Sequence, residues 1–178
     1  MATKPSASLT VCVTGSESTG KTTLAQALAA AYDAPCVPEV ARAYLSGKTA
    51  YTQDDVLAIA REQLNKEQAA LADAPPLLVC DTDLLVIRIW WEVKYGTLHP
   101  WLRDRLAELT PRCYLLTNPE VPWQPDPLRE SSGDRADLHE RYRRALETDR
   151  FPYVELCGDE QQRLRQACAQ IERWQSLS

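Results

Sequence analysis

Residues Gly15 to Thr22 (GSESTGKT) match the phosphate-binding pattern G-x-x-x-x-G-K-[ST] at every fixed position. An apolar run, Leu9 to Val13, stands before them and an Ala- and Leu-rich run, Lys21 to Tyr32, follows, which predicts a buried strand and a helix. The two glycines allow successive backbone N–H groups to face one anion, and the helix start adds its own free N–H groups. A chance Gly- and Ser-rich turn is the alternative, but it would not require that strand and that helix. The pattern therefore predicts a nucleoside triphosphate site.

The loop also supplies side chains for phosphate and metal binding. The Lys21 ammonium can reach the β- and γ-phosphates, and the Thr22 hydroxyl can coordinate Mg²⁺. No N-K-x-D motif, which would specify guanine, occurs in the chain, and this counts against a Ras-like GTPase. A preference between ATP and GTP is not otherwise indicated. The residues expected to bind ATP are Gly15, Glu17, Ser18, Thr19, Gly20, Lys21, Thr22 and Thr23.

Two aspartates follow the most apolar short run of the chain, Leu77 to Cys80 (LLVC). Ligands of open parallel sheets bind at the carboxyl ends of the strands, which is where Asp81 and Asp83 are expected to lie. A carboxylate there can hold Mg²⁺ directly or through water, and the other could bind an acceptor hydroxyl. Capping of the next helix is the alternative role for this pair. We expect both to act in catalysis, with Asp81 at the metal, and the residues leave their division of roles open.

Acceptor-side and lid residues are expected elsewhere in the chain. Glu39 follows a weak second strand, Ala34 to Pro38, and Arg42 comes one helical turn later. The carboxylate could face a substrate hydroxyl as base or orienting group, and a surface ion pair with Arg42 is the alternative. Arg129 lies in the Pro-rich segment Asn118 to Gly133, where a cation could close over the transferring phosphoryl group and exclude water.

An aromatic group, Trp90, Trp91 and Tyr95, falls on the helix expected from Leu84 to Tyr95. Adjacent tryptophans cannot both face the core, so one of them is expected to line a cleft or an interface. Such a face would suit a flat heterocycle, and a cationic ring would gain a further interaction with the π system. Aromatic residues at helical spacing also serve as ordinary core, which is the alternative.

The order of the expected elements predicts the fold class. Apolar short runs alternate with helical patterns, as in a parallel sheet flanked by helices. We expect an α/β P-loop NTPase fold of the nucleoside-kinase type, formed by one domain that spans residues 1–178, with a lid loop. The five expected strands are Leu9 to Val13, Ala34 to Pro38, Leu77 to Cys80, Cys113 to Thr117 and Pro152 to Cys157.

Composition and net charge limit the binding partners and the cellular location that we expect. The net charge of −5 argues against broad nucleic-acid binding, which needs a basic surface. No apolar stretch approaches the length of a membrane span, and Met1 to Ser8 lacks the apolar core of a secretion signal. The six cysteines form no C-x-x-C pair, so we expect reduced thiols in a cytoplasmic protein and no zinc site. The expected partner is a small nucleoside, and the oligomeric state is not indicated.

Four runs of the chain together resemble one family, the nicotinamide riboside kinase domain at the C-terminus of bacterial bifunctional NAD-biosynthesis regulators. The phosphate loop is widespread, but the E-x-x-R, D-T-D and L-R motifs are more selective in combination. The runs are GSESTGKTTLAQALA (15–29), PEVARAYL (38–45), CDTDLLVIRIWWEVKYG (80–96) and the run from LLTN through Trp123 to DPLR (115–129).

The resemblance implies a P-loop kinase that uses MgATP to phosphorylate the ribose 5′-hydroxyl of nicotinamide riboside, a step of NAD salvage. Only Met1 to Ser8 precede the first expected strand, so we expect no adenylyltransferase domain, and the step from mononucleotide to NAD would need a separate protein. The residue roles that the resemblance implies are Lys21 and Thr22 at the phosphates and Mg²⁺, Asp81 and Asp83 at the metal and acceptor, Glu39 and Arg42 on the acceptor side, Trp90, Trp91 and Tyr95 at the ring, and Arg129 in the lid.

Two alternative functions stay open at the level of the sequence. The first is a kinase that acts on another nucleoside, such as a purine or pyrimidine nucleoside. The second is a regulatory ATPase switch, in which a loop such as Asn118 to Gly133 would take a conformation set by the γ-phosphate and bind a protein partner. Dependence of nucleotide turnover on a small acceptor or on a protein separates the two.

Overall fold

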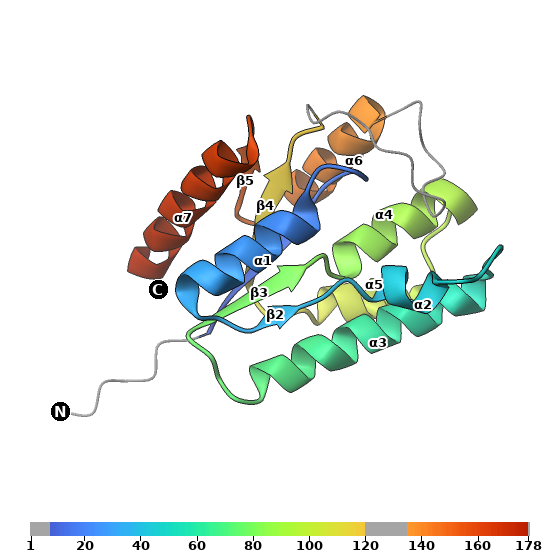
Figure 1. Cartoon of the computed structure of the whole chain (residues 1–178). Helices are drawn as coiled ribbons and strands as arrows, with labels where there is room; N and C mark the ends of the chain where they lie inside the picture. The colour runs from blue at the N-terminus through green and yellow to red at the C-terminus, as the bar shows by residue number, and fades with distance from the viewer. Residues whose placement is uncertain (1–7, 120–134, 178) are drawn as a thin grey trace.

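Strand β1 (Leu9–Thr14) lies at the centre of a five-stranded parallel sheet whose order is β2-β3-β1-β4-β5 (Figure 1). It pairs with β3 on one side, with Val13 opposite Asp81, and with β4 on the other side, with Thr14 opposite Leu116. This computed structural model describes residues 8–119 and 135–177. The other strands are β2 (Cys36–Val37), β3 (Leu77–Asp81), β4 (Arg112–Thr117) and β5 (Tyr153–Leu156).

Helices cover both faces of the sheet, which confirms the predicted P-loop α/β class (Figure 1). Helices α1 and α7 pack on one face, and α4 and α6 pack on the other. Helices α2, α3 and α5 pack together with α4 in a further apolar cluster. The helices are α1 (Lys21–Tyr32), α2 (Val40–Leu45), α3 (Gln53–Leu71), α4 (Leu84–Tyr95), α5 (Pro100–Ala107), α6 (Arg135–Thr148) and α7 (Glu160–Leu177).

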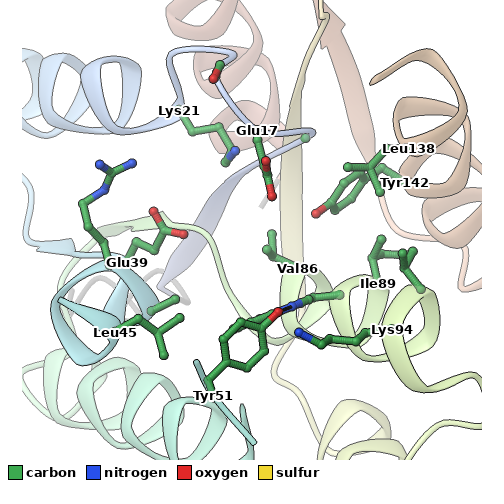
Figure 2. A pocket seen from close by; sticks show the side chains of 16 residues that line it. Glu17, Lys21, Glu39, Leu45, Tyr51, Val86, Ile89, Lys94, Leu138 and Tyr142 are labelled. Carbon is green, nitrogen blue, oxygen red and sulfur yellow. Dashed lines mark hydrogen bonds between the residues drawn. The ribbon is translucent and has the colours of Figure 1, made fainter. Parts of the chain in front are cut away.

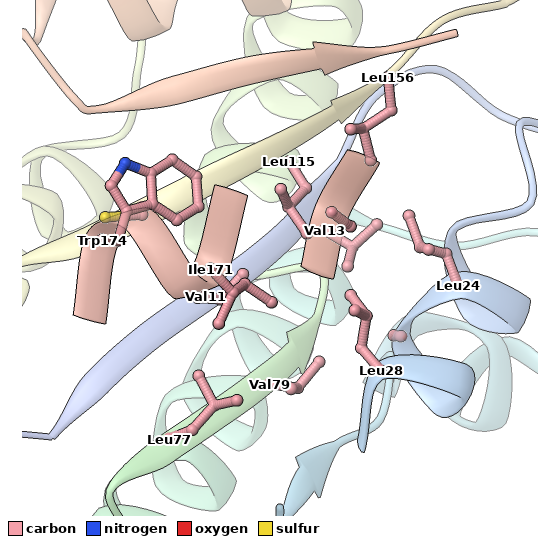
Figure 3. Close-up of a cluster of buried hydrophobic side chains, with 13 residues drawn as sticks. Val11, Val13, Leu24, Leu28, Leu77, Val79, Leu115, Leu156, Ile171 and Trp174 are labelled. Atoms are coloured by element: carbon pink, nitrogen blue, oxygen red, sulfur yellow. The ribbon is translucent and has the colours of Figure 1, made fainter. Parts of the chain in front are cut away.

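The core on the α1 and α7 face is formed by branched side chains from the central strands. Val11 and Val13 of β1 and Leu115 of β4 are fully buried against Leu28 of α1 and Ile171 of α7 (Figure 3). Strands that are covered on both faces need apolar residues at successive positions, and the burial of β1 and β4 follows that rule. This packing fixes the start of α1 relative to the end of β1, which is where the phosphate-binding loop lies.

Helix α4 contributes to two apolar clusters because it is apolar on most of its surface. Leu85 and Ile89 pack on the sheet with Leu146 of α6. Trp91, which is 3% exposed, lies on the other side of the helix, in the apolar cluster with Ile59 of α3 and Leu102 of α5. Two sides of α4 are therefore buried in the core.

Local sequence sets the ends of several elements. Strand β2 is only two residues long, shorter than predicted, because Pro35 and Pro38 flank it and lack the N–H group that a ladder needs. Helix α3 begins with a capping box, since the Thr52 side chain accepts from the Asp55 N–H and the Asp55 side chain accepts from the Thr52 N–H. None of the helices within residues 8–119 and 135–177 has the length and apolarity needed to span a membrane.

Candidate active site

The loop between β1 and α1 needs glycine at both of its fixed glycine positions. Gly15 has a φ of +135°, and a Cβ there would lie 2.6 Å from the hydroxyl oxygen and 2.9 Å from the carbonyl oxygen of Thr117. Gly20 has a φ of +78° and is the N-cap of α1. Both backbone conformations favour glycine. At Gly15, any side chain would also collide with Thr117. The loop therefore passes β4 at a distance that no other residue would permit.

Threonine hydroxyls hold this loop against the sheet. Thr19 Oγ1 donates to the Ser16 carbonyl oxygen at 2.8 Å and lies 2.6 Å from Thr117 Oγ1. The Thr117 hydroxyl in turn donates to the Thr14 carbonyl oxygen at 3.1 Å. Lys21 Nζ donates to the Ser16 carbonyl oxygen at 2.8 Å, which holds the ammonium over the concave side of the loop. The predicted phosphate cradle is thus preorganised by hydrogen bonds.

Arg163 of α7 ties the phosphate loop to the end of β4. Its Nη1 donates to the Thr19 carbonyl oxygen at 2.7 Å, and its Nη2 donates to the Asn118 carbonyl oxygen at 2.9 Å. The side chain is 3% exposed, so these charge-assisted hydrogen bonds form away from solvent. This link was not predicted from the sequence, because Arg163 lies 144 residues from Thr19.

Asp81 and Thr22 form a pair that fits a magnesium ion. Asp81 is 2% exposed, interacts with the Thr22 side chain, and carries a buried Oδ1 with no hydrogen-bond partner among the described residues. Burial raises the pKa of Asp81 above its usual value, although the Thr22 hydrogen bond and the charges of Lys21 and Arg42 act in the opposite direction. A hydroxyl and a carboxylate oxygen beside a phosphate cradle are the donor set that Mg²⁺ uses in such sites. The residues present therefore fit the ion.

A cavity of about 380 Å³ opens from the phosphate loop. Figure 2 shows Lys21 and Glu17 on one side of it, Glu39 beside them, and Tyr51 and Lys94 on the opposite side. Such a volume is within the range of about 300–1,000 Å³ that is usual for small-molecule sites. The lining residues come from the phosphate loop, α2, the loop after α2, α4 and α6.

The aromatic residues of α4 divide between cavity and core. Trp90 lines the cavity, on the same helical stripe as Val86 and Val93. Trp91 is buried in the core, where its Nε1 donates to the Thr97 carbonyl oxygen at 3.0 Å. Tyr95 packs on Trp91 with ring centroids 4.9 Å apart and does not line the cavity. The adjacent tryptophans therefore face different environments, and the structure brings Trp90 alone of the three to the cavity.

The carboxylates of the cavity lie near its phosphate end. Glu39 is the N-cap of α2 and lines the cavity with Arg42 and Glu17. Tyr142 of α6 also lines it, and burial, together with the negative charges of Glu17 and Glu39, raises the pKa of its hydroxyl. Two carboxylates and a neutral phenol hydroxyl can hold sugar hydroxyls, because each offers hydrogen-bond acceptors in a fixed place.

Asp83 has a buried environment of its own and does not line this cavity. Its Oδ1 accepts from the Leu85 N–H at 3.0 Å, as the N-cap of α4. Its Oδ2 accepts from Tyr114 Oη at 2.7 Å and from Arg112 Nη1 at 3.1 Å, and Arg112 Nη2 lies 2.7 Å from Glu67 Oε1. Asp83 is 0% exposed, so these partners occupy its carboxylate away from solvent. Asp83 thus caps a helix, which is the alternative role considered for the two aspartates.

The remaining expected site residues line the cavity, lie at the start of α1, or fall outside the described residues. Ser18 lines the cavity, whereas Gly20 and Thr23 are exposed at the start of α1. Arg129 lies outside the described residues. Sequence reasoning missed Tyr51, Lys94 and Tyr142; Lys94 could have been found, because it is four residues after Trp90 on the same face of α4.

These features define a P-loop nucleotide-binding protein. A glycine loop after the first strand of a parallel sheet leads into a helix, and a buried aspartate ends the neighbouring strand. The chain belongs to the AAA domain family, which it matches over residues 10–163. No curated protein matches its sequence.

Solved structures of NadR protein are similar to this chain, which confirms the resemblance predicted from the sequence. A crystal structure of NadR protein in complex with NR is 25% identical, with a TM-score of 0.78, and the match covers 97% of this chain and 51% of that one. NadR protein in complex with NAD and AMP-PNP is 26% identical, with a TM-score of 0.68 over 86% of this chain and 45% of that one. The chain therefore spans about half the length of these relatives. Deoxyadenosine kinase from M. mycoides, 10% identical, shares the fold with a TM-score of 0.59, over 93% of this chain and 100% of that one.

Proposed function

We propose that the chain is an ATP-dependent kinase that phosphorylates the ribose 5′-hydroxyl of nicotinamide riboside and so yields nicotinamide mononucleotide. The observation that carries this proposal is the continuous cavity between the phosphate loop and Trp90. One end suits a triphosphate and the other suits a flat heterocycle. The similarity to NadR in complex with NR, which we take as nicotinamide riboside, supports the choice of acceptor.

The nucleotide side of the proposed reaction rests on the loop and on Asp81. Lys21 would hold the β- and γ-phosphates, and Thr22 with Asp81 would hold Mg²⁺. When bound, the ion supplies charge neutralisation on the phosphates. Arg129 is proposed to close over the transferring group, as predicted from its place in the Pro-rich segment.

The acceptor side rests on Glu39, Arg42 and Trp90. In the proposed step the 5′-oxygen attacks the γ-phosphorus, and the O5′–P bond forms as the bond to the β–γ bridging oxygen breaks. The electron pair of that bond stays on ADP, and the hydroxyl proton passes to Glu39. We propose that Arg42 and Glu39 hold the ribose end and that the Trp90 ring contacts the base, because all three line the same cavity.

An ATP-to-ADP coupled assay with Mg²⁺ and a panel of nucleosides tests the proposal, with the product identified by mass. Formation of nicotinamide mononucleotide from nicotinamide riboside is the expected result. Turnover with a purine or pyrimidine nucleoside instead would keep the kinase and overturn the acceptor. Nucleotide hydrolysis that no nucleoside stimulates would overturn the kinase as well.

A further inference from the structure

Gln63 is a polar residue on the buried side of helix α3. Val56 and Ile59 lie seven and four residues before it on the same side of the helix and are buried, and Gln63 itself is 2% exposed. A side-chain amide that is removed from water needs hydrogen-bond partners for both its oxygen and its nitrogen. The partners of Gln63 therefore explain why an amide stands where the helical pattern calls for an apolar residue.

Both groups of the Gln63 amide bind the backbone on either side of Glu39. The Gln63 Oε1 accepts from the Val40 N–H at 2.9 Å, and its Nε2 donates to the Pro38 carbonyl oxygen at 3.3 Å. Pro38 and Val40 are the two chain neighbours of Glu39. One amide from α3 thus bridges the residue that the proposed function uses as the base. The bridge needs a side chain that carries both a donor and an acceptor.

This bridge takes over part of the usual work of a helix cap. Glu39 is the N-cap of α2, but its side chain makes no capping hydrogen bond. An N-cap side chain ordinarily accepts from a backbone N–H of the first turn, which draws it back over the start of its own helix. In α2 the first N–H, that of Val40, is bound by Gln63 instead. Figure 2 shows the Glu39 carboxylate directed into the cavity.

From these contacts we infer that Gln63 is a positioning residue for Glu39, because it fixes the backbone that aims the carboxylate at the acceptor hydroxyl. The inference rests on the proposed kinase function, in which the 5′-hydroxyl proton passes to Glu39. A general base must lie within hydrogen-bond reach of the proton that it removes, and a displacement of about 1 Å can lower a rate about 100-fold. Gln63 does not line the cavity, so its effect on the reaction must pass through Glu39.

A double-mutant cycle in the full chain tests the inference. Gln63→Met keeps the length of the side chain and removes both hydrogen bonds, and it is combined with Glu39→Gln, which removes the base. Gln63→Asn is a second variant, because its amide is one methylene shorter and cannot bridge both backbone groups. Tyr44→Phe is the matched control, because the Tyr44 hydroxyl also ties α2 to α3, through a 3.1 Å hydrogen bond to Asp55, but Tyr44 does not line the cavity.

Four quantities are measured for every variant. They are kcat, the KM for MgATP, the equilibrium dissociation constant of nicotinamide riboside without nucleotide, and the unfolding midpoint. The midpoint reports the loss of stability that follows when buried backbone groups lose their partners. The comparison of kcat between the two backgrounds is independent of that loss.

We expect Gln63→Met and Gln63→Asn to lower kcat about 10- to 100-fold with an unchanged KM for MgATP, whereas Tyr44→Phe should leave kcat nearly unaltered. In the Glu39→Gln background the same changes at Gln63 should lower kcat by less than about twofold, because no base is left to misplace. A loss by the same factor in both backgrounds would mean a purely structural role and would overturn the inference. An unaltered kcat in Gln63→Met would also overturn it.

The binding measurement separates this inference from the proposed function. Glu39 is also proposed to hold the ribose, so Gln63→Met should weaken binding of nicotinamide riboside in the unaltered background but not in Glu39→Gln. That coupling in a chain that phosphorylates no nucleoside would support the role of Gln63 and overturn the kinase. Phosphorylation of nicotinamide riboside without coupling between Gln63 and Glu39 would keep the kinase and overturn the role of Gln63. If nicotinamide riboside neither binds nor reacts, both are overturned.

Discussion

Asp81 and Asp83 are separated by one residue, yet the structure gives them opposite surroundings. Asp81 has a buried oxygen without a hydrogen-bond partner among the described residues and lies beside Thr22. The carboxylate of Asp83 accepts hydrogen bonds from Leu85, Arg112 and Tyr114. A group with unused acceptor capacity suits a ligand, and a group that is fully engaged suits support of the fold. At the residue scale, the two aspartates therefore differ in what their loss should do.

Replacement of each aspartate by alanine should separate stability from activity. Asp83→Ala should lower the free energy of unfolding by about 3–5 kcal/mol, because it leaves a buried guanidinium and a buried hydroxyl without their shared acceptor. Asp81→Ala should change it by less than about 1 kcal/mol, because no such donor is stranded there. Denaturant unfolding checks both values, and similar losses for the two variants would contradict this division.

Lys21 should contribute to the chemical step far more than to folding. Its ammonium is placed over the loop, where it would stabilise charge on the phosphates in the transition state. Lys21→Ala should lower kcat about 10²–10³-fold with an unchanged unfolding midpoint. Steady-state kinetics with denaturant unfolding checks this, and unaltered turnover would remove the loop from the mechanism.

The raised pKa of Asp81 predicts a pH dependence of MgATP binding. Burial favours the protonated acid more than in an ordinary aspartate, whose pKa is about 3.9, so the Asp81 carboxylate forms at a higher pH. Magnesium needs the carboxylate, so MgATP affinity should rise as pH increases through the raised pKa and fall as pH decreases through it. Without ligand, the free energy of unfolding should fall as pH increases from the Asp81 pKa of the unfolded chain to the raised Asp81 pKa of the folded chain.

Calorimetric titration with MgATP across this pH range checks the dependence. Asp81→Asn should flatten it, and titration with ATP in the absence of the metal provides the reference. An equally steep acid limb in Asp81→Asn would assign the dependence to another group.

At the scale of elements, the helices that carry the site were predictable from the sequence. The predicted bounds of α1 and α4 are those of the structure, because periodic apolar residues and local end signals define them. The pairing of Thr22 with Asp81 also has local signals, since Thr22 follows from the loop motif and Asp81 from the end of an apolar strand. These features depend on residues that are close in sequence.

Contacts between distant elements were not predictable in the same way. Arg112 lies 29 residues from Asp83 and 45 residues from Glu67, and no local pattern indicates that the three meet in the interior. Tyr51 and Tyr142 reach the cavity from a loop and from α6 because the sheet order brings these segments beside α4. The acceptor end of the site is thus a product of tertiary packing, whereas the phosphate end is largely local.

At the scale of the whole molecule, Arg163 connects the C-terminal helix to the loop near the N-terminus. Arg163→Ala should raise the KM for ATP about tenfold or more and lower the unfolding midpoint, because two buried carbonyl groups lose charged donors. Arg163→Lys should restore part of the ATP affinity. Arg165→Ala is the matched control, because that side chain is exposed on the same helix. A change in stability with an unaltered KM would reduce Arg163 to a packing role.

Helix α4 turns one stripe to the cavity and two of its other sides to the core, with Val86, Trp90 and Val93 on the stripe and Leu85 and Trp91 in the core. The nucleotide loop belongs to different elements, β1 and α1. Laboratory evolution confined to those three positions should therefore change which molecule the cavity binds without altering the residues of the phosphate loop. Selectivity for the proposed acceptor and binding of the nucleotide could thus be engineered independently, because different elements of the fold carry them.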